Sequence, residues 1–232
     1  MSVALIIGAG AAVGKLSAEA FAAAGYKVAV ASRTQRFDPA KFPFFEFDAA
    51  EPTHLPALFK KVHQEVGVPD VVIYNAYASL RGDHGVLDID SPEGFQKRIN
   101  VNGISPTIAA DEAVKGFLKL ESEGKLGPQG ATYIFTGNAL NDKPIKGFFS
   151  LGIGKTTAAY TLEYLALHGH NDKPFSFYYV DERRTDGRPM YKGVNADAHA
   201  KVFLELAQNP EQGPWQYTFS KEEGYAVFSK DW

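Results

Sequence analysis

The chain contains no cysteine, which excludes disulfide bonds, thiolate metal sites and a cysteine nucleophile. An excess of charge of either sign is also missing, because 24 basic and 27 acidic residues leave a net charge of −3. Such a balance provides no field that attracts nucleic acid or an anionic membrane. The composition therefore favours a small-molecule substrate, with no nucleic-acid or membrane partner.

The N-terminal region has no long apolar segment. The first apolar run, Val3–Ile7, ends at Gly8 and is too short for the core of a signal peptide or for a membrane span. We therefore expect a cytoplasmic protein. The histidines show no ligand spacing with acidic partners, so we expect no metal site.

Short apolar runs alternate with segments of helical periodicity along most of the chain. Strands are expected over residues 3–7, 28–31, 44–47, 71–74, 132–136, 175–180 and 216–219. Helices are expected over residues 11–24, 55–66, 94–120, 150–168 and 197–208. This alternation implies right-handed crossovers, and 232 residues suit a single domain. The expected fold is a three-layer α/β/α Rossmann-type domain, a doubly wound parallel sheet of about six or seven strands.

Three glycines, Gly8, Gly10 and Gly14, lie between the first strand and the first helix. In that position backbone N–H groups and the helix dipole can receive a pyrophosphate. The spacing G-x-G-x-x-G would need a glycine at position 13, where the chain has Val13. The flanking strand and helix still favour a dinucleotide-binding turn, and the alternative is a tight turn whose glycines only permit positive φ.

The second strand ends at Ser32 and Arg33, and no acidic residue follows until Asp38. An enzyme that uses NAD generally has an acidic residue here for the ribose hydroxyls, whereas an arginine suits a 2′-phosphate. Arg33 can hold a phosphate with two hydrogen bonds, and Ser32 adds a hydroxyl. We therefore expect NADP(H) in preference to NAD(H); the alternative is that Arg33 is a solvated loop residue.

The ordered set of motifs resembles the short-chain dehydrogenases/reductases over about residues 3–208. Residues 7–14, Ile-Gly-Ala-Gly-Ala-Ala-Val-Gly, are similar to the family's T-G-x-x-x-G-x-G, with Ala12 at the middle glycine. Asn75 and Ala76 resemble part of the N-N-A-G motif that follows strand four. The resemblance and the glycine turn together imply a cofactor site made by Gly8, Gly10, Ala12, Val13, Gly14, Ser32, Arg33, Asp48, Asn75, Ala76, Lys155 and Thr185.

The same resemblance breaks at the catalytic positions. Asn102 is similar to the helix asparagine of the family's proton relay, and Lys155 to the lysine of Y-x-x-x-K. Leu151 stands where that motif has its tyrosine, and Gly137 stands where the family has a serine after strand five. A leucine has no proton to transfer, so two of the four catalytic positions are lost.

The segment over residues 181–195 is predicted to be a polar connection, part of it a loop over the substrate. It lacks the family's P-G pair, and Thr185 falls near the threonine that contacts the nicotinamide amide in the family. Its arginines could recognise an acidic substrate or a phosphate. A solvated charge cluster is the alternative.

Two functions are compatible with these residues. The first is an NADP(H)-dependent oxidoreductase for a carbonyl or hydroxyl compound, whose proton comes from water, the substrate or a displaced side chain. The second is a catalytically inactive dinucleotide-binding protein, a sensor or partner subunit. A lyase or isomerase on the same fold is a third possibility that no residue selects. The resemblance also implies a homodimer or homotetramer that pairs through the helices bearing Asn102 and Lys155.

Overall fold

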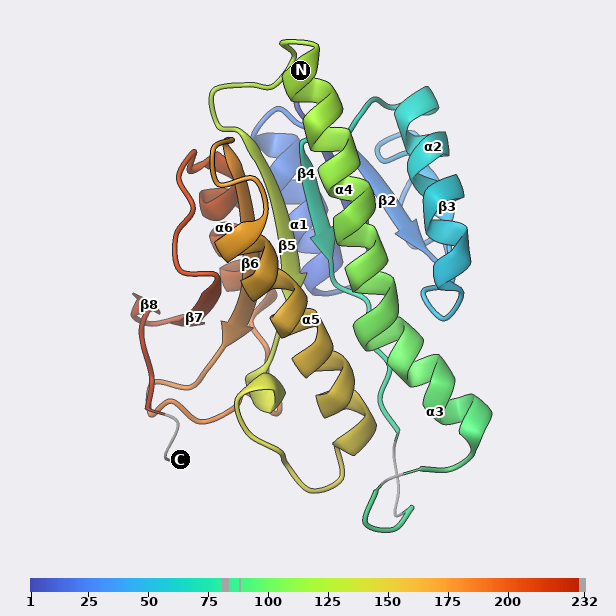
Figure 1. Ribbon diagram of the computed structural model, residues 1–232, viewed down its shortest axis with the longest axis vertical. Coiled ribbons are helices and arrows are strands. Elements are labelled where there is room, and N and C mark those ends of the chain that lie inside the picture. Colours follow the sequence, from blue (N-terminus) through green and yellow to red (C-terminus); the bar gives the residue numbers. More distant parts are fainter. Residues whose placement is uncertain (81–83, 88, 230–232) are drawn as a thin grey trace.

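A central β-sheet organises the chain, whose computed structural model describes residues 1–80, 84–87 and 89–229 (Figure 1). Its strands are β1 (Val3–Ile7), β2 (Lys27–Ser32), β3 (Phe44–Glu46), β4 (Val71–Tyr74), β5 (Ala131–Thr136), β6 (Phe175–Glu182), β7 (Gln216–Ser220) and β8 (Gly224–Tyr225). The strand order is β3-β2-β1-β4-β5-β6-β7-β8. Every neighbouring pair is parallel except β7 and β8. The order reverses between β1 and β4, which confirms the doubly wound α/β fold.

Helices cover both faces of this sheet. They are α1 (Val13–Ala23), α2 (Leu55–Glu65), α3 (Pro92–Ile99), α4 (Ser105–Ser122), α5 (Phe149–His168) and α6 (Ala196–Gln208). Helices α2, α4 and α5 share one apolar core with the sheet, and α1 and α6 share the other (Figure 1). Among the described residues, no helix combines the length and the apolar character needed to cross a membrane.

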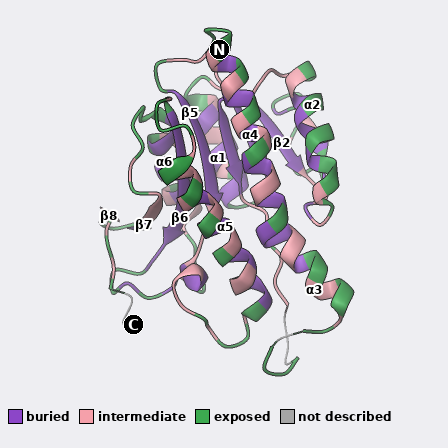
Figure 2. Ribbon diagram, in the orientation of Figure 1, coloured by how far each residue is buried: buried purple, intermediate pink, exposed green. Residues whose placement is uncertain are grey.

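The inner strands are buried on both faces, which explains their continuous apolar sequences. In β1, Leu5 and Ile7 belong to the core under α4, whereas Ala4 and Ile6 belong to the core under α1. Figure 2 shows the sheet buried throughout its centre, between helices whose outer sides are exposed. A strand with two buried faces has no polar side to alternate, so its sequence is an uninterrupted apolar run.

The helix expected over residues 94–120 is divided, so that prediction was wrong in its continuity. Helix α3 is followed by a π-helical turn, Asn100–Ile104, before α4 begins. The Ser105 N–H donates to the carbonyl of Asn100, five residues back. Pro106 has no N–H to offer the carbonyl of Asn102, so the regular α-helical ladder cannot pass this point unchanged.

The sheet is also larger than expected. It has eight strands instead of six or seven, and β6 extends to Glu182, two residues beyond the predicted end. Asp181 and Glu182 pair with Thr218 and Phe219 of β7 although both are charged. Their side chains are nevertheless buried. Partners from other parts of the fold offset the free energy of removing these groups from water, a cost that a sequence pattern alone would treat as prohibitive.

Candidate active site

A cleft of about 540 Å³ opens at the carboxyl ends of β1, β2 and β4. The strand order reverses here, which is where open α/β sheets bind their ligands. The predicted cofactor residues that line it are Gly8, Gly10, Ser32, Arg33, Asp48, Asn75 and Ala76. The structure therefore brings together residues from four separate segments of the sequence, at or after the ends of β1, β2, β3 and β4.

The close approach of two backbone segments explains why residue 8 is a glycine. Its φ is +85°, and a Cβ at this position would lie 2.2 Å from the backbone nitrogen of Ala76. The side-chain amide of Asn75 donates to the Gly8 carbonyl at 2.9 Å, and the Gly8 N–H donates to Ala31 O at 2.8 Å. The end of β4 is thus joined to the glycine turn through contacts that only a glycine allows.

Other predicted cofactor residues lie outside the lining of this cleft. Ala12 is exposed just before α1, while Val13 and Gly14 are buried at the start of that helix. A Cβ on Gly14 would lie 2.7 Å from Cα of Ala9, so this glycine lets the helix pack on the turn. Thr185 is exposed beyond the end of β6.

Sequence analysis missed several residues of the cleft. Arg36 lines it together with Arg33, and its position three residues further along the same basic segment was an available signal. Lys97 reaches the cleft from α3, and Tyr77 lies beyond the end of β4. No local pattern marked Lys97, because only the packing of α3 brings it to this edge.

Lys155 lies in α5 against the end of β5, and its side chain is buried, with 4% of the residue exposed. Its ammonium donates to Thr136 O at 2.7 Å and stands 4.3 Å from the centroid of the Phe135 ring. Burial lowers the pKa of Lys155 to about 7, and the carboxylate of Asp181 opposes this shift.

Asn102 is fully buried in the π-helical turn. Its side-chain oxygen accepts from the Ala78 N–H at 3.1 Å, and its amide donates to Ala78 O at 2.7 Å and to Arg98 O at 2.8 Å. Ala78 lines the cleft, so Asn102 holds one wall of the cleft from behind. On α5, a Cβ at Gly154 would lie 2.3 Å from Cβ of Asn102, which shows how closely the two elements pack.

Comparison with known proteins decides the family. The family model for short chain dehydrogenases matches residues 2–126. The short chain dehydrogenase/reductase dmxR12 of Cryptosporiopsis sp. (strain 8999) is 35% identical over 98% of this chain and 95% of that protein. The chain belongs to the short-chain dehydrogenase/reductase family.

Solved structures share the fold at lower identity. An NADH-dependent reductase, A1-R', in complex with NAD has a TM-score of 0.74 at 19% identity, over 89% of this chain and 88% of that one. A metagenomic short-chain oxidoreductase in complex with NADP has a TM-score of 0.73 at 17% identity, covering 94% and 96%. A 3-oxoacyl-[acyl-carrier protein] reductase from Brucella melitensis has a TM-score of 0.75 at 19% identity, covering 91% and 94%.

In this short-chain dehydrogenase/reductase, another side chain fills the space beside Gly137. A Cβ at Gly137 would lie 2.2 Å from Cε1 of Tyr179, on the neighbouring strand β6. The Tyr179 hydroxyl donates to Asn138 O at 2.7 Å and accepts from the Asn138 N–H at 3.0 Å. Leu151 is buried in α5. Position 137 therefore has no room for a serine while Tyr179 is present.

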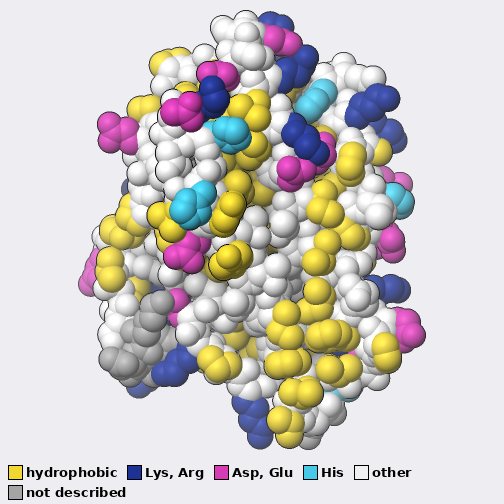
Figure 3. Space-filling view, viewed as in Figure 1, with side chains coloured by type: hydrophobic (Ala, Val, Ile, Leu, Met, Phe, Trp, Pro, Cys, Tyr) yellow, Lys and Arg dark blue, Asp and Glu magenta, His cyan; other side chains and the backbone are white. Residues whose placement is uncertain are grey.

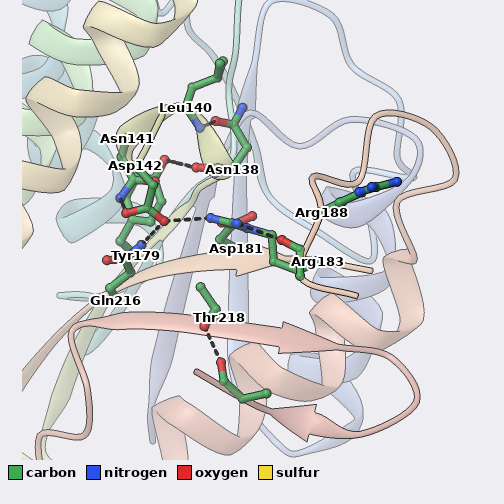
Figure 4. Close-up of polar contacts among 12 residues, drawn as sticks. Asn138, Leu140, Asn141, Asp142, Tyr179, Asp181, Arg183, Arg188, Gln216 and Thr218 are labelled. Atoms are coloured by element: carbon green, nitrogen blue, oxygen red, sulfur yellow. Dashed lines mark hydrogen bonds and ion pairs between the residues drawn. The ribbon is translucent and has the colours of Figure 1, made fainter. Parts of the chain in front are cut away.

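A buried charge cluster lies on the same face of the sheet, next to this tyrosine (Figure 4). The Arg183 guanidinium donates to Asp181 Oδ2 through Nε, to Asp142 Oδ2 at 2.8 Å and to the Gly187 carbonyl at 3.1 Å. Gln216 also donates to Asp142 at 2.8 Å. Arg183 is 2% exposed and Asp181 1% exposed, so the solvated cluster considered for this segment was wrong for Arg183.

Burial raises the pKa of Asp181 to about 7, and the charges of Arg183 and Lys155 oppose that shift. The cluster therefore interacts electrostatically with Lys155 in the N-terminal half of α5. Its members come from β6, the segment after β6, β7 and the segment before α5, so no local pattern could have identified it.

Proposed function

We propose that this chain is an NADP(H)-dependent oxidoreductase that acts on a carbonyl or hydroxyl compound through a non-standard active site. The observation that carries the proposal is the cleft at the strand-order reversal, which joins the glycine turn to two arginines. Two solved proteins of similar fold hold NAD or NADP. When bound, the nicotinamide supplies or accepts the hydride, and the protein provides orientation and electrostatics.

The residues of the cleft fit a dinucleotide. A Cβ on Gly10 would have no heavy atom closer than 4.0 Å, so its backbone borders open space, as an approach to phosphate requires. Helix α1 begins behind the turn, and no side chain of the described residues caps its N-terminus. Uncapped N–H groups and the helix dipole favour an anion at this end of the helix.

Two exposed arginines support a preference for the 2′-phosphate. Arg33 and Arg36 both line the cleft, and neither forms an ion pair within the described ranges. The Ser32 hydroxyl donates to Thr34 O at 2.8 Å, so its hydrogen is already used. We therefore assign the 2′-phosphate to the guanidinium groups, which offer paired donors, in preference to Ser32.

Titration of the purified protein with NADPH and NADH tests this preference. Arg33→Ala is expected to weaken NADPH binding about 10-fold or more, because a hydrogen bond to a charged group contributes about 1.5–3 kcal/mol. NADH, which has no 2′-phosphate, should bind Arg33→Ala and the native protein nearly alike. Lys201→Ala removes an exposed positive charge from α6 and serves as the control. Equal losses for both nucleotides would contradict the assignment.

Turnover separates the oxidoreductase from the inactive dinucleotide-binding protein. The native protein should convert at least one member of a panel of aldehydes, ketones and quinones when NADPH is supplied. Binding of NADPH without any turnover would favour the sensor or partner role, for which the buried Leu151 and the filled space at Gly137 are the relevant observations.

We also propose that the protein forms a homodimer or homotetramer through α4 and α5. A groove between these helices is lined by Ile104, Thr107, Ile108, Thr156, Thr157, Tyr160 and Thr161. Hydrophobic side chains gather on this face (Figure 3), where Tyr160 is 69% and Tyr164 55% exposed. Exposed apolar surface of this kind marks sites of association. Residence in the cytoplasm stays a prediction.

A further inference from the structure

The ring of Tyr77 lies exposed in the cleft at the strand-order reversal. Tyr77 lines this cleft at the position where the N-N-A-G motif has its glycine, and 67% of the residue is exposed. Among the described residues, no hydrogen bond involves its hydroxyl and no other aromatic ring stacks on it. Phe47, the other aromatic residue of the lining, is 5% exposed and packs in the core. Tyr77 therefore presents the one open aromatic face that the described residues bring to the cleft.

The backbone on both sides of Tyr77 is fixed. Before it, Ala76 packs so closely on the glycine turn that a Cβ at Gly8 would lie 2.2 Å from the Ala76 nitrogen. After it, both polar backbone atoms of Ala78 are bound by the side chain of Asn102. The chain that leaves β4 thus passes beside the junction of α3 and α4 with little freedom (Figure 1). An exposed tyrosine ring on a fixed backbone loses little more than the freedom of its side-chain torsions when a ligand covers it.

The cleft also has a lining of small apolar side chains, which are Ala49, Ala50, Ala76, Ala78 and Val101. The π-helical turn and the start of α4 hold two of them in place. The Asn100 side chain donates to Ala50 O at 2.9 Å, and the Ser105 hydroxyl donates to Ala49 O at 2.7 Å. Small side chains leave room for a flat ring, and apolar ones suit the faces of an uncharged heteroaromatic ring in preference to a phosphate. These surroundings distinguish Tyr77 from an isolated apolar residue on an open surface, which needs no explanation.

The covalent structure of a dinucleotide places its adenine in this cleft. Arg33 and Arg36, to which the 2′-phosphate is assigned, belong to the same lining. Adenine and the 2′-phosphate are attached to one ribose, so the base lies within the length of a sugar from these guanidinium groups. Leu151 and Lys155 do not line the cleft, whose described lining is confined to the ends of β1 to β4 and to α3 with the turn that follows it. The ring within reach of Tyr77 is therefore the adenine and not the nicotinamide.

We propose that the Tyr77 ring stacks on the adenine of the bound dinucleotide and provides much of the affinity for its adenosine half. This inference rests on the proposed oxidoreductase function. Stacking on an aromatic side chain depends on the π face of the base and not on a distant phosphate. Tyr77 therefore strengthens the binding of NADPH and NADH equally, whereas Arg33 distinguishes between them. Affinity and selectivity thus depend on different residues of one cleft.

Calorimetric titration of four proteins tests the stacking. Native protein, Tyr77→Phe, Tyr77→Ala and Tyr225→Ala are titrated with NADPH, NADH and adenosine 2′,5′-diphosphate, which has no nicotinamide. Tyr77→Ala should weaken all three ligands about 10-fold, as is typical when an aromatic ring is removed from a base. Tyr77→Phe keeps the ring and should bind nearly like the native protein. Tyr225 is 41% exposed on β8, at the opposite edge of the sheet from β3, so Tyr225→Ala is the control and should retain native affinities.

Three outcomes would overturn the inference. If Tyr77→Ala bound adenosine 2′,5′-diphosphate with native affinity but both dinucleotides more weakly, the ring would lie on the nicotinamide. An equal loss in Tyr77→Phe and Tyr77→Ala would assign the effect to the hydroxyl. Native affinities of Tyr77→Ala for all three ligands would leave the ring without a role in binding. Circular dichroism melts show whether each variant folds.

NMR of the native chain tests the stacking without relying on the stability of a variant. In tyrosine-labelled protein saturated with adenosine 2′,5′-diphosphate, the ring protons of Tyr77 should show nuclear Overhauser effects to H2 or H8 of adenine. Absence of these effects at saturation would overturn the stacking. The native titrations separate this inference from the proposed function: no binding of NADPH or NADH would refute both, whereas binding without any contact between Tyr77 and adenine would refute only the inference.

Discussion

At the scale of single residues, neighbouring side chains define the surroundings of Gly137, Asp181 and Arg183. Gly137 lacks a side chain, and the Tyr179 ring occupies the space that one would need. The charges of Asp181 and Arg183 are buried, and they pair with each other. The region beyond the end of β5 is therefore filled by an aromatic ring and by buried, paired charges.

The contact between Gly137 and Tyr179 predicts the effect of adding a side chain. Gly137→Ser should destabilise the protein by about 1–3 kcal/mol, because an inserted group would overlap a buried ring that cannot move freely. Adding Tyr179→Ala should make the double variant less unstable than the sum of the two single changes. Urea unfolding measures all four proteins, and Gly152→Ser, where a Cβ meets nothing closer than 4.0 Å, is the control. Strict additivity would contradict the steric explanation.

Burial of Lys155 also predicts how stability depends on pH. Its pKa is lowered to about 7, so the folded chain binds fewer protons than the unfolded chain between pH 7 and the ordinary lysine range. Its contribution to stability is present above that range and is lost as pH falls through 7. The pKa of Asp181 is shifted in the opposite direction, up to about 7. Its contribution to stability is therefore lost as the pH rises through 7, and it changes little above pH 7.

Between pH 8 and 9.5 the lysine therefore dominates this pair. The unfolding free energy of native protein should rise by about 1.4 kcal/mol per pH unit relative to Lys155→Met, the slope for one proton. Denaturant melts at three pH values measure it. If the unfolding free energies of the two proteins changed with pH in parallel, Lys155 would not lose its proton on folding.

At the scale of elements, the π-helical turn between α3 and α4 determines the position of Asn102. The turn directs the asparagine side chain to both polar backbone atoms of Ala78, across to the segment that follows β4. A regular helix over residues 94–120 would have preserved the periodicity but not this link. Helix irregularity here supports one wall of the cleft.

Removing that link should affect both stability and binding. Asn102→Ala is expected to destabilise the protein by about 1–3 kcal/mol, since it removes the hydrogen bonds that the fully buried side-chain amide makes with Ala78 and with Arg98 O. Dinucleotide affinity should fall as well, because Ala78 lines the cleft. Gln96→Ala, which removes an exposed hydrogen bond on α3, is the comparison. If a folded Asn102→Ala protein bound the dinucleotide with unchanged affinity, Asn102 would not support the cleft.

At the scale of the whole molecule, the α4–α5 face is the surface proposed for self-association. Tyr160→Glu places a charge on it while changing little in the monomer, because the tyrosine is 69% exposed. The variant should elute as a monomer in light-scattering chromatography, whereas the native protein should have two or four times the monomer mass. Lys201→Glu on α6 should leave the native mass unchanged. A native monomer would refute the proposed assembly.

The sequence by itself determined the alternation of strands and helices and the position of the glycine turn. These features depend on local patterns: continuous apolar runs mark strands buried on both faces, and a glycine with positive φ marks a tight turn. Only the tertiary structure decided that Tyr179 fills the space at Gly137 and that Arg183 is buried against Asp142, 41 residues away. Such contacts join segments distant in sequence, and the free energy of burying a charge depends on partners that no local pattern contains.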